Sequence, residues 1–188
     1  MTPFDIETAA RGAWSEPGLP WWYNYAHEAV LAGRWWTIHR HDSDVYLARF
    51  WISEPRRDEA KASVGDCPFD VENSVMLHLF LRPDDDESLH DHPSPFTTTL
   101  LQGEYVEARP SPGWDRESGL GPCPSNNLLH WPAGSVIRRK ADDLHAIVRL
   151  KTNIVWTLVR TGARERPWGF WPEGKPWMAA KEYIKDHP

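Results

Sequence analysis

The pattern of hydrophobic and polar residues along this chain predicts short β-strands separated by turns. Residues 35–39 and 45–52 are rich in aromatic and aliphatic side chains, which favour strands. Residues 75–82 alternate between a face of Val and Leu side chains and a face that includes His78 and Arg82. These segments indicate a fold built mainly from strands.

Two further pairs of strands are predicted in the middle of the chain. Residues 96–101 are β-branched and apolar, and Gly103 interrupts them before the extended pattern resumes at 105–107. This arrangement indicates a strand, a tight turn and a strand. Gly134 opens a second pair, in which a charged turn ends the first strand and His145 begins the next.

Three histidines in these segments predict a metal site. His90 and His92 stand two positions apart, and side chains with that spacing on an extended strand point to the same side. A ring nitrogen of each can therefore reach one metal ion. The strand that begins at His145 can bring its ring back to this pair, so we expect all three histidines to converge.

The two segments resemble the two sequence motifs of the cupin superfamily. His90, His92 and Gly103 occupy matching places in the first motif, and Gly134 and His145 match the spacing of the second. The resemblance covers roughly residues 75–160. It implies an all-β fold, a jelly-roll β-barrel with a metal inside one end and short helical or irregular extensions at both termini.

Several positions depart from the cupin motifs. Phe96 stands where the glutamate ligand belongs, and Asp84 replaces the leading glycine. In the second motif, a proline, a glycine and an asparagine are replaced by Lys140, Asp142 and Arg149. The resemblance therefore implies three histidine ligands, and a fourth protein ligand would have to come from elsewhere in the chain.

The chain is also similar to thiol dioxygenases, a cupin branch that uses three histidines and iron. The similarity rests on the triplet at 90–92 and on the Leu-Leu-Gln-Gly turn at 100–103. The spacer after His92 is one residue shorter than in that branch, and Phe96 replaces the cysteine of its cross-linked members. The serine-histidine-tyrosine relay of that branch is not visible around Trp156.

We expect one domain over residues 1–188, since 17 prolines and 12 glycines suit many short strands joined by turns. The barrel would span roughly 35–160, with an N-terminal extension over 1–34 and an aromatic tail over 161–188 that packs back on the barrel. We expect short helices at 6–11, at 25–32 and within 175–186, and a last strand at 152–160.

The segment 109–127 is rich in proline and glycine and lies between the two motifs. Such an insertion is either a loose surface loop or a lid over the mouth of the barrel. The sequence pattern leaves both interpretations open.

The charge balance bears on the partners. The chain has 21 basic and 27 acidic side chains, a net charge of -6, and no run of lysine and arginine, so we expect no nucleic acid partner. No apolar stretch has the length needed to span a bilayer, and the start lacks a basic segment followed by an apolar one. We therefore expect no membrane partner and a cytoplasmic location. The cupin resemblance implies a homodimer.

The ligand set limits which metal ions the site would bind. Three imidazoles without a carboxylate suit Fe(II), Zn(II), Ni(II) or Cu(II), and Mn(II) is a further candidate. We predict Fe(II) and an oxygenase or dioxygenase that acts on a small carboxylate-bearing or aromatic molecule. A non-redox isomerase, decarboxylase or lyase is the alternative, and so is a non-catalytic cupin that binds a small ligand.

Three further residues are candidates for catalysis. Alternation from His145 places Arg149 on the ligand face, where it would hold a substrate carboxylate or an internal acid. His78 lies on one face of a preceding strand and is a similar candidate, or it would serve as a base. Glu104 is the carboxylate nearest to the motif glycine and would serve as a fourth ligand or as a base.

Overall fold

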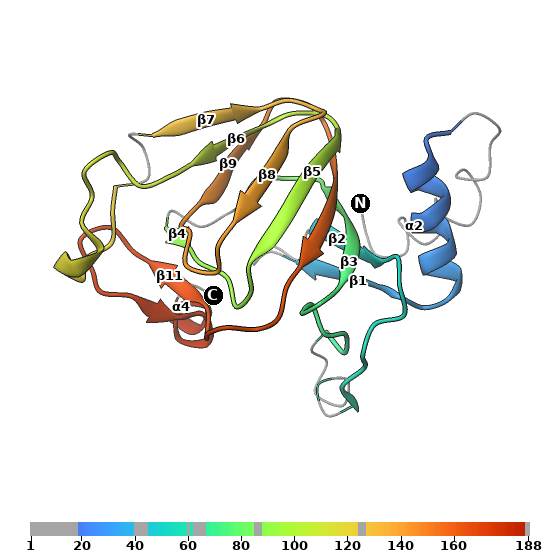
Figure 1. Ribbon diagram of the computed structural model, residues 1–188, viewed down its shortest axis with the longest axis horizontal. Helices are drawn as coiled ribbons and strands as arrows, with labels where there is room; N and C mark the ends of the chain where they lie inside the picture. The colour runs from blue at the N-terminus through green and yellow to red at the C-terminus, as the bar shows by residue number, and fades with distance from the viewer. Residues whose placement is uncertain are drawn as a thin grey trace.

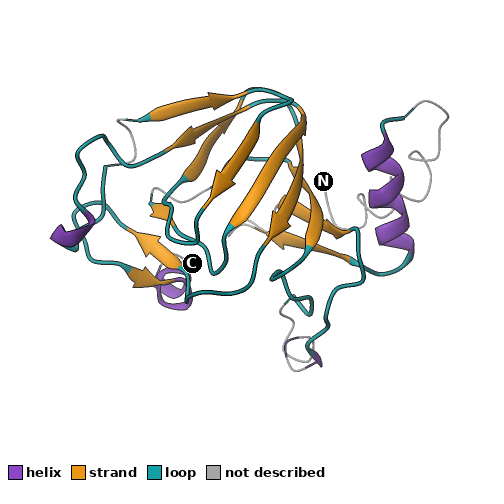
Figure 2. Ribbon diagram, in the orientation of Figure 1, coloured by secondary structure: helices purple, strands orange, loops and turns teal. Residues whose placement is uncertain are grey.

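Strands dominate the part of the chain that the structure describes (Figure 2). The structure is a computed structural model that describes residues 19–39, 45–59, 61, 67–84, 88–123 and 127–186. The strands pair in antiparallel sheets, with short helices towards both ends, so the predicted all-β fold is confirmed. The helix predicted at 6–11 lies outside the described residues.

The largest sheet has six strands in the order β1-β2-β3-β10-β5-β8, and every neighbouring pair is antiparallel. Their bounds are β1 (Trp35–His39), β2 (Val45–Trp51), β3 (Val75–Phe80), β10 (Val155–Thr161), β5 (Phe96–Gln102) and β8 (Val136–Arg139). The three strands predicted first in the chain are therefore present, and they pair in sequence order.

Helix α2 (Trp21–Leu31) packs against one face of this sheet (Figure 1). It begins four residues before the predicted start and ends in a turn at Gly33, whose φ is 68°. The N–H groups of Gly33 and Arg34 donate to the carbonyls of Val30 and Ala29, the pattern of a Schellman cap. Because α2 covers the Val and Leu face of β3, both faces of that strand are buried.

Two three-stranded sheets complete the β structure. One has the order β7-β6-β9, with β7 (Leu128–Trp131), β6 (Tyr105–Ala108) and β9 (Ala146–Leu150). The other has the order β12-β11-β4, with β12 (Met178–Ala179), β11 (Gly169–Trp171) and β4 (Leu89–His90). Leu47 and Phe80 of the large sheet share a core cluster with Tyr105 and Ile147, so the interior lies between the large sheet and β6-β9.

The aromatic tail packs back on the barrel, as predicted. Phe170 of β11 pairs with His90 of β4, and its ring stacks on Tyr183 of helix α4 (Ala180–Asp186) at a centroid distance of 4.0 Å. The prediction that 152–160 is the last strand is wrong, because β11 and β12 follow β10. These short strands lie among prolines and tryptophans, and they pair only with each other and with β4, so no local pattern predicts them.

The proline- and glycine-rich loop packs on this tail over its described residues. The ring of Trp114 meets that of Trp171 edge to face at 5.5 Å, and the Arg116 guanidinium lies 5.4 Å from the Trp171 ring. Gly121 pairs with Glu173 in a parallel bridge. Aromatic packing therefore holds this segment against the C-terminal strands.

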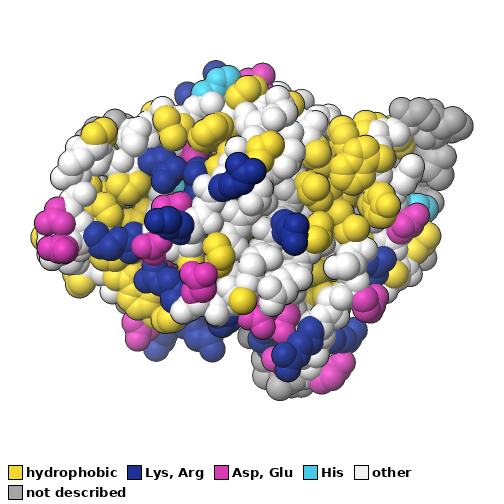
Figure 3. Space-filling view, in the orientation of Figure 1, with side chains coloured by type: hydrophobic (Ala, Val, Ile, Leu, Met, Phe, Trp, Pro, Cys, Tyr) yellow, Lys and Arg dark blue, Asp and Glu magenta, His cyan; other side chains and the backbone are white. Residues whose placement is uncertain are grey.

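The surface mixes charges of both signs on the face drawn in Figure 3, where Lys and Arg side chains alternate with Asp and Glu. Hydrophobic side chains gather over α2, which exposes Trp21, Tyr25 and Leu31. In the described part of the chain, no helix is both long enough and apolar enough to cross a bilayer.

Gly103 forms the corner between β5 and β6, which belong to different sheets. Its φ of 79° lies in the left-handed region, and a Cβ there would lie 2.4 Å from the carbonyl oxygen of Ile154 and 2.5 Å from Oγ1 of Thr152. The predicted tight turn is present. It redirects the chain into a second sheet and does not close a hairpin.

We expect Gly103→Ala to lower the free energy of unfolding by about 3 kcal/mol, because it adds a backbone clash to the cost of a positive φ. Gly134→Ala is the matched control: its φ is 90°, but nothing lies within 4 Å of the added Cβ. In the control, the free energy of unfolding should fall by about 1 kcal/mol. Equal losses in urea unfolding would show that the crowding at Gly103 does not matter.

Candidate metal centre

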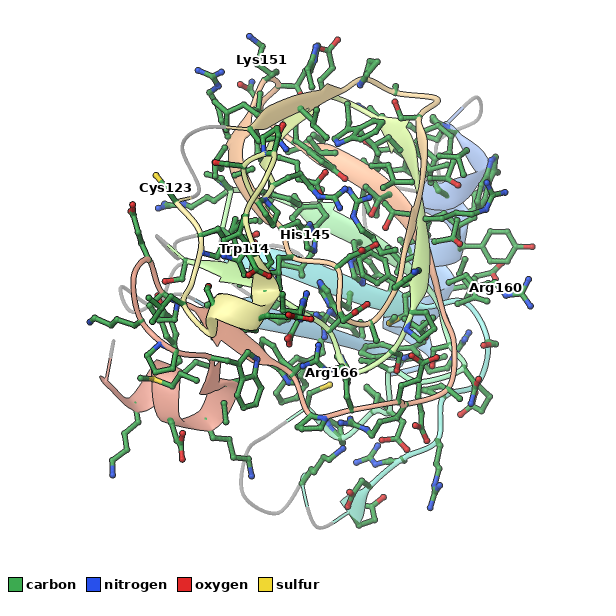
Figure 4. The ribbon with its side chains drawn as sticks, turned by 60° about the vertical axis from the view of Figure 1, so that its left-hand side comes forward. Trp114, Cys123, His145, Lys151, Arg160 and Arg166 are labelled. Carbon is green, nitrogen blue, oxygen red and sulfur yellow. The ribbon has the colours of Figure 1, made fainter. Side chains whose placement is uncertain are left out.

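The three predicted histidines converge at one end of the barrel. His90 and His145 face each other in an antiparallel bridge, in which each backbone N–H donates to the other carbonyl, at 3.0 and 3.1 Å. His92 follows two residues after His90, so its ring points to the same side. Figure 4 shows His145 in the interior, while Lys151 and Arg160 lie at the outer edges.

The ring nitrogens of the three histidines suit a single metal ion. One nitrogen from each ring lies within 4.8 Å of the others, and Nε2 of His92 is 2.7 Å from Nε2 of His145. Nδ1 of His90 is buried and has no hydrogen-bond partner among the described residues. A buried nitrogen without a partner is costly, and coordination to a metal would remove that cost.

Burial keeps the imidazoles of His90 and His92 neutral, which is the form that binds metals. Burial and the charge of His145 lower the pKa of His90 to about 3. Burial also holds the pKa of His92 well below its usual value, and His145, His90, Arg49 and His78 lower it further. Both rings therefore offer lone pairs at neutral pH.

Asp91 lies between two of these histidines and points to the opposite side. Its side chain is 0% exposed and accepts hydrogen bonds from Gly169 N at 2.8 Å and Trp177 Nε1 at 3.0 Å. Arg166 Nη1 lies 2.9 Å from its Oδ2. One residue of the triplet thus fastens the C-terminal tail, while its two neighbours face the metal site.

Glu107 of β6 supports the centre from behind and was not predicted from the sequence. It is 1% exposed, and its Oε1 lies 2.7 Å from Nδ1 of His145. Arg139 Nη2 donates to the same carboxylate at 2.6 Å, and Trp131 Nε1 donates at 2.8 Å. A hydrogen bond from Nδ1 to this carboxylate would leave Nε2 as the nitrogen with which His145 binds a metal.

Glu107 is ionised despite its burial. Burial alone raises its pKa, but hydrogen bonding and charge interaction with His145 and Arg139 outweigh that effect and bring the pKa to about 2. A signal was present in the sequence. Glu107 stands two positions after Tyr105, and Arg139 stands two positions after Ile137. Each charged residue therefore shares a strand face with a large apolar side chain.

A cavity of about 250 Å³ opens beside the histidines. It is lined by the three histidines, by aliphatic and aromatic side chains of the large sheet and of β6 and β9, and by the polar side chains of Arg49, His78 and Thr157 among others. None of the described residues of the 109–127 segment lines it. The described residues of that segment pack on the C-terminal strands and do not cover this cavity.

Of the three predicted catalytic residues, the structure brings only His78 to this cavity. Glu104 lies outside the cavity and pairs with His130, with Nε2 2.8 Å from Oε2. The expectation that Arg149 shares the ligand face is wrong. Val106 pairs with Arg149 and Glu107 with Ile147, so Val148 is an extra residue in a β-bulge, which turns Arg149 towards solvent.

Phe96 occupies the place of the missing glutamate. Its ring centroid lies 4.5 Å from that of His92 and 5.9 Å from that of His145. The motif position that would supply a carboxylate ligand thus supplies an apolar ring, which packs against the histidines. Within the described residues, the cluster of possible metal ligands consists of histidines only.

Comparisons with known proteins add a likeness of fold. No protein-family model matches this chain, and no curated protein matches it. A crystal structure of Fe(II) HppE matches with 13% identity and a TM-score of 0.43 over 68% of this chain and 55% of that chain. The match therefore spans little more than half of the length of HppE.

Two other solved structures match in a similar way. The DMSP lyase DddQ from Ruegeria pomeroyi matches with 15% identity and a TM-score of 0.44, over 87% of this chain and 74% of its own. The polyketide cyclase RemF from Streptomyces resistomycificus matches with 10% identity and a TM-score of 0.40, over 76% of this chain and 80% of its own. Likeness at this level carries no activity over to this chain.

Acid should destabilise the metal-free protein through the buried histidines. The pKa of His90 is about 3 in the fold against 6.5 in its absence, so between these values the unfolded chain binds a proton that the folded chain does not. The free energy of unfolding should fall as the pH falls through this window, by up to about 1.4 kcal/mol per pH unit for this group. His78 and His92 act in the same direction.

Urea unfolding in the presence of a chelator, between pH 4 and pH 6.5, measures this slope. In His90→Gln, the slope should be shallower by roughly one proton. An unchanged slope would show that His90 does not take part.

Glu107→Gln should separate two roles of one carboxylate. Without the charge, Arg139 is left as a buried cation, so the free energy of unfolding should fall by about 3 kcal/mol. The affinity for Zn(II), measured by competition with a chelator, should fall roughly 10- to 100-fold. Adding Arg139→Met should restore stability but not metal affinity, and recovery of both would contradict a role of Glu107 in orienting His145.

Proposed function

We propose that this protein is a mononuclear Fe(II)-dependent oxygenase whose metal is held by His90, His92 and His145. The observation that carries the proposal is the cluster of three imidazoles in the wall of one cavity, with Phe96 where a carboxylate ligand would stand. Three protein ligands leave coordination positions for a substrate and for dioxygen. Imidazole ligands suit Fe(II), although they do not select it over other divalent metals.

Each side chain around the centre has a definite part in this proposal. The metal supplies the activation of dioxygen when it is bound. Glu107 holds His145 in one tautomer and one orientation through Nδ1. Phe96 and Phe170 place apolar rings against the histidines, so they exclude water from that side of the site.

The cavity limits the size of the substrate. Its volume of about 250 Å³ is below the roughly 300–1,000 Å³ that sites for drug-sized ligands occupy. Its walls are mainly apolar, with Leu47, Phe80 and Val159 among them. A small molecule with an apolar body fits these walls, and it would lie directly beside the metal.

A Lewis-acid isomerase, decarboxylase or lyase is the second candidate, and His78 favours it. This residue lines the same cavity, and burial together with Arg49 holds its pKa well below the usual value. A neutral imidazole can accept a proton from a bound substrate. Such a reaction would need no dioxygen, so the two candidates differ in what they consume.

Metal analysis of the full chain, purified without oxygen, tests the proposal. We expect about one iron per chain, retained on gel filtration and lost in His92→Ala, and dioxygen uptake that depends on addition of a small carboxylic acid or aromatic compound. Zinc without uptake of dioxygen would favour the Lewis-acid reaction. A chain that binds no divalent metal, with His92→Ala unchanged in stability and ligand binding, would overturn both and leave a non-catalytic binding protein.

A further inference from the structure

Three polar side chains stand side by side on the cavity face of the large sheet. Arg49 of β2 is the register partner of His78 of β3, and His78 is the partner of Thr157 of β10. Side chains directly opposite each other on antiparallel strands project to the same face and lie within contact distance. All three line the cavity beside the histidine centre.

Each of these side chains has a buried polar atom without a hydrogen-bond partner. Arg49 Nε, His78 Nε2 and Thr157 Oγ1 have none among the described residues, and His78 and Thr157 are 9% and 0% exposed. A buried polar group that lacks a partner costs free energy, and a buried charge costs more. Three such groups next to one another indicate that a ligand supplies the missing partner.

Arg49 differs from the other charged residues that line this cavity. Arg139 is paired with Glu107, and Asp84 accepts a hydrogen bond from Ile147 N at 2.7 Å. Arg49 has no carboxylate partner in the described part of the chain. Its guanidinium keeps its charge even though burial lowers its pKa.

We propose that Arg49, His78 and Thr157 form a carboxylate-binding subsite, which holds the acid group of the small substrate against the large sheet. This inference rests on the proposed function in one respect, namely that the bound acid is the substrate of the metal enzyme. The binding of the acid itself requires no metal.

The chemistry of the three residues fits a carboxylate. A guanidinium presents two parallel N–H donors that match the two oxygens of the group. The Thr157 hydroxyl can donate to either oxygen, and neutral His78 can donate through Nε2 in one of its tautomers. One fixed positive charge balances a single negative charge, so the pair of Arg49 and the acid would carry no net charge.

The position of the subsite limits where the substrate can react. Arg49, His78 and His92 line the same cavity, whose volume is about 250 Å³. A small substrate held there by its acid group would therefore lie beside the metal. The sequence predicted an arginine in this role, Arg149, but the structure places that residue in solvent and Arg49 in the cavity.

Binding of simple acids tests the subsite. Isothermal titration with butyrate, benzoate and phenylacetate, each compared with its neutral amide, is carried out on the full chain with Zn(II) and without metal. At least one acid should bind more tightly than its amide by about tenfold or more, because a hydrogen bond to a charged group is lost in the amide. Arg49→Met should weaken that acid by about tenfold or more and leave the amide unchanged.

Arg149→Met is the matched control, since it removes an arginine of the same barrel that is exposed and outside the cavity. Its affinity for the acid should equal that of the wild type. An equal loss in both variants, or no acid that binds better than its amide, overturns the subsite. If benzenesulfonate binds as tightly as benzoate, the site binds anions in general and does not select carboxylates. That result would overturn the assignment of the ligand.

The stability of Arg49→Met separates a ligand site from a structural arginine. Replacing an unpaired buried charge by an apolar side chain of similar length should keep the melting temperature or raise it. A marked fall would show that Arg49 holds the fold together and would overturn the proposal.

Failure of the subsite and failure of the metal enzyme give different results. Acid binding that depends on Arg49 in a chain that takes up no metal supports the subsite and removes the proposed function. Acid binding that is unchanged in Arg49→Met but lost in His92→Ala places the acid on the metal, which overturns the subsite and leaves the enzyme standing.

Discussion

The buried carboxylate of Glu107 is the constraint on which the candidate centre depends. It contacts His145, which directly precedes β9, and the side chains of Arg139 from β8 and Trp131 from β7. Because β8 belongs to the large sheet and β6 to a small one, the same group joins the two walls of the barrel. An ion in this interior is tolerable only with such partners, so loss of any of them would disturb both the fold and the position of His145.

The polar groups of the interior divide into two kinds. Glu107 and Asp91 are fully buried carboxylates whose partners the fold supplies, and they fasten a sheet and a tail. The histidine centre and Arg49 instead offer lone pairs or charge to a cavity. A buried polar group without a partner costs stability, which is the reason to propose that the second kind binds ligands.

Local patterns were enough to predict most elements of the barrel. The alternation at 75–82, the corner at Gly103 and the turn before His145 correspond to observed strands and turns. Arg149 was misplaced because alternation assumes an unbroken ladder, and one extra residue at Val148 reverses the faces beyond it. Arg49 was missed because a strand covered on both sides has no polar face to reveal which side holds the cavity.

The sequence by itself determined the strand-rich fold and the three histidines, because period-two alternation and fixed spacings from glycines are local properties of the chain. Only the tertiary structure decided what surrounds them. Glu107 meets His145 across the β6–β9 pair, and Arg49, His78 and Thr157 meet across three strands separated by long stretches of chain. Those partners depend on strand order and register, which arise from packing among distant segments and are written in no local pattern.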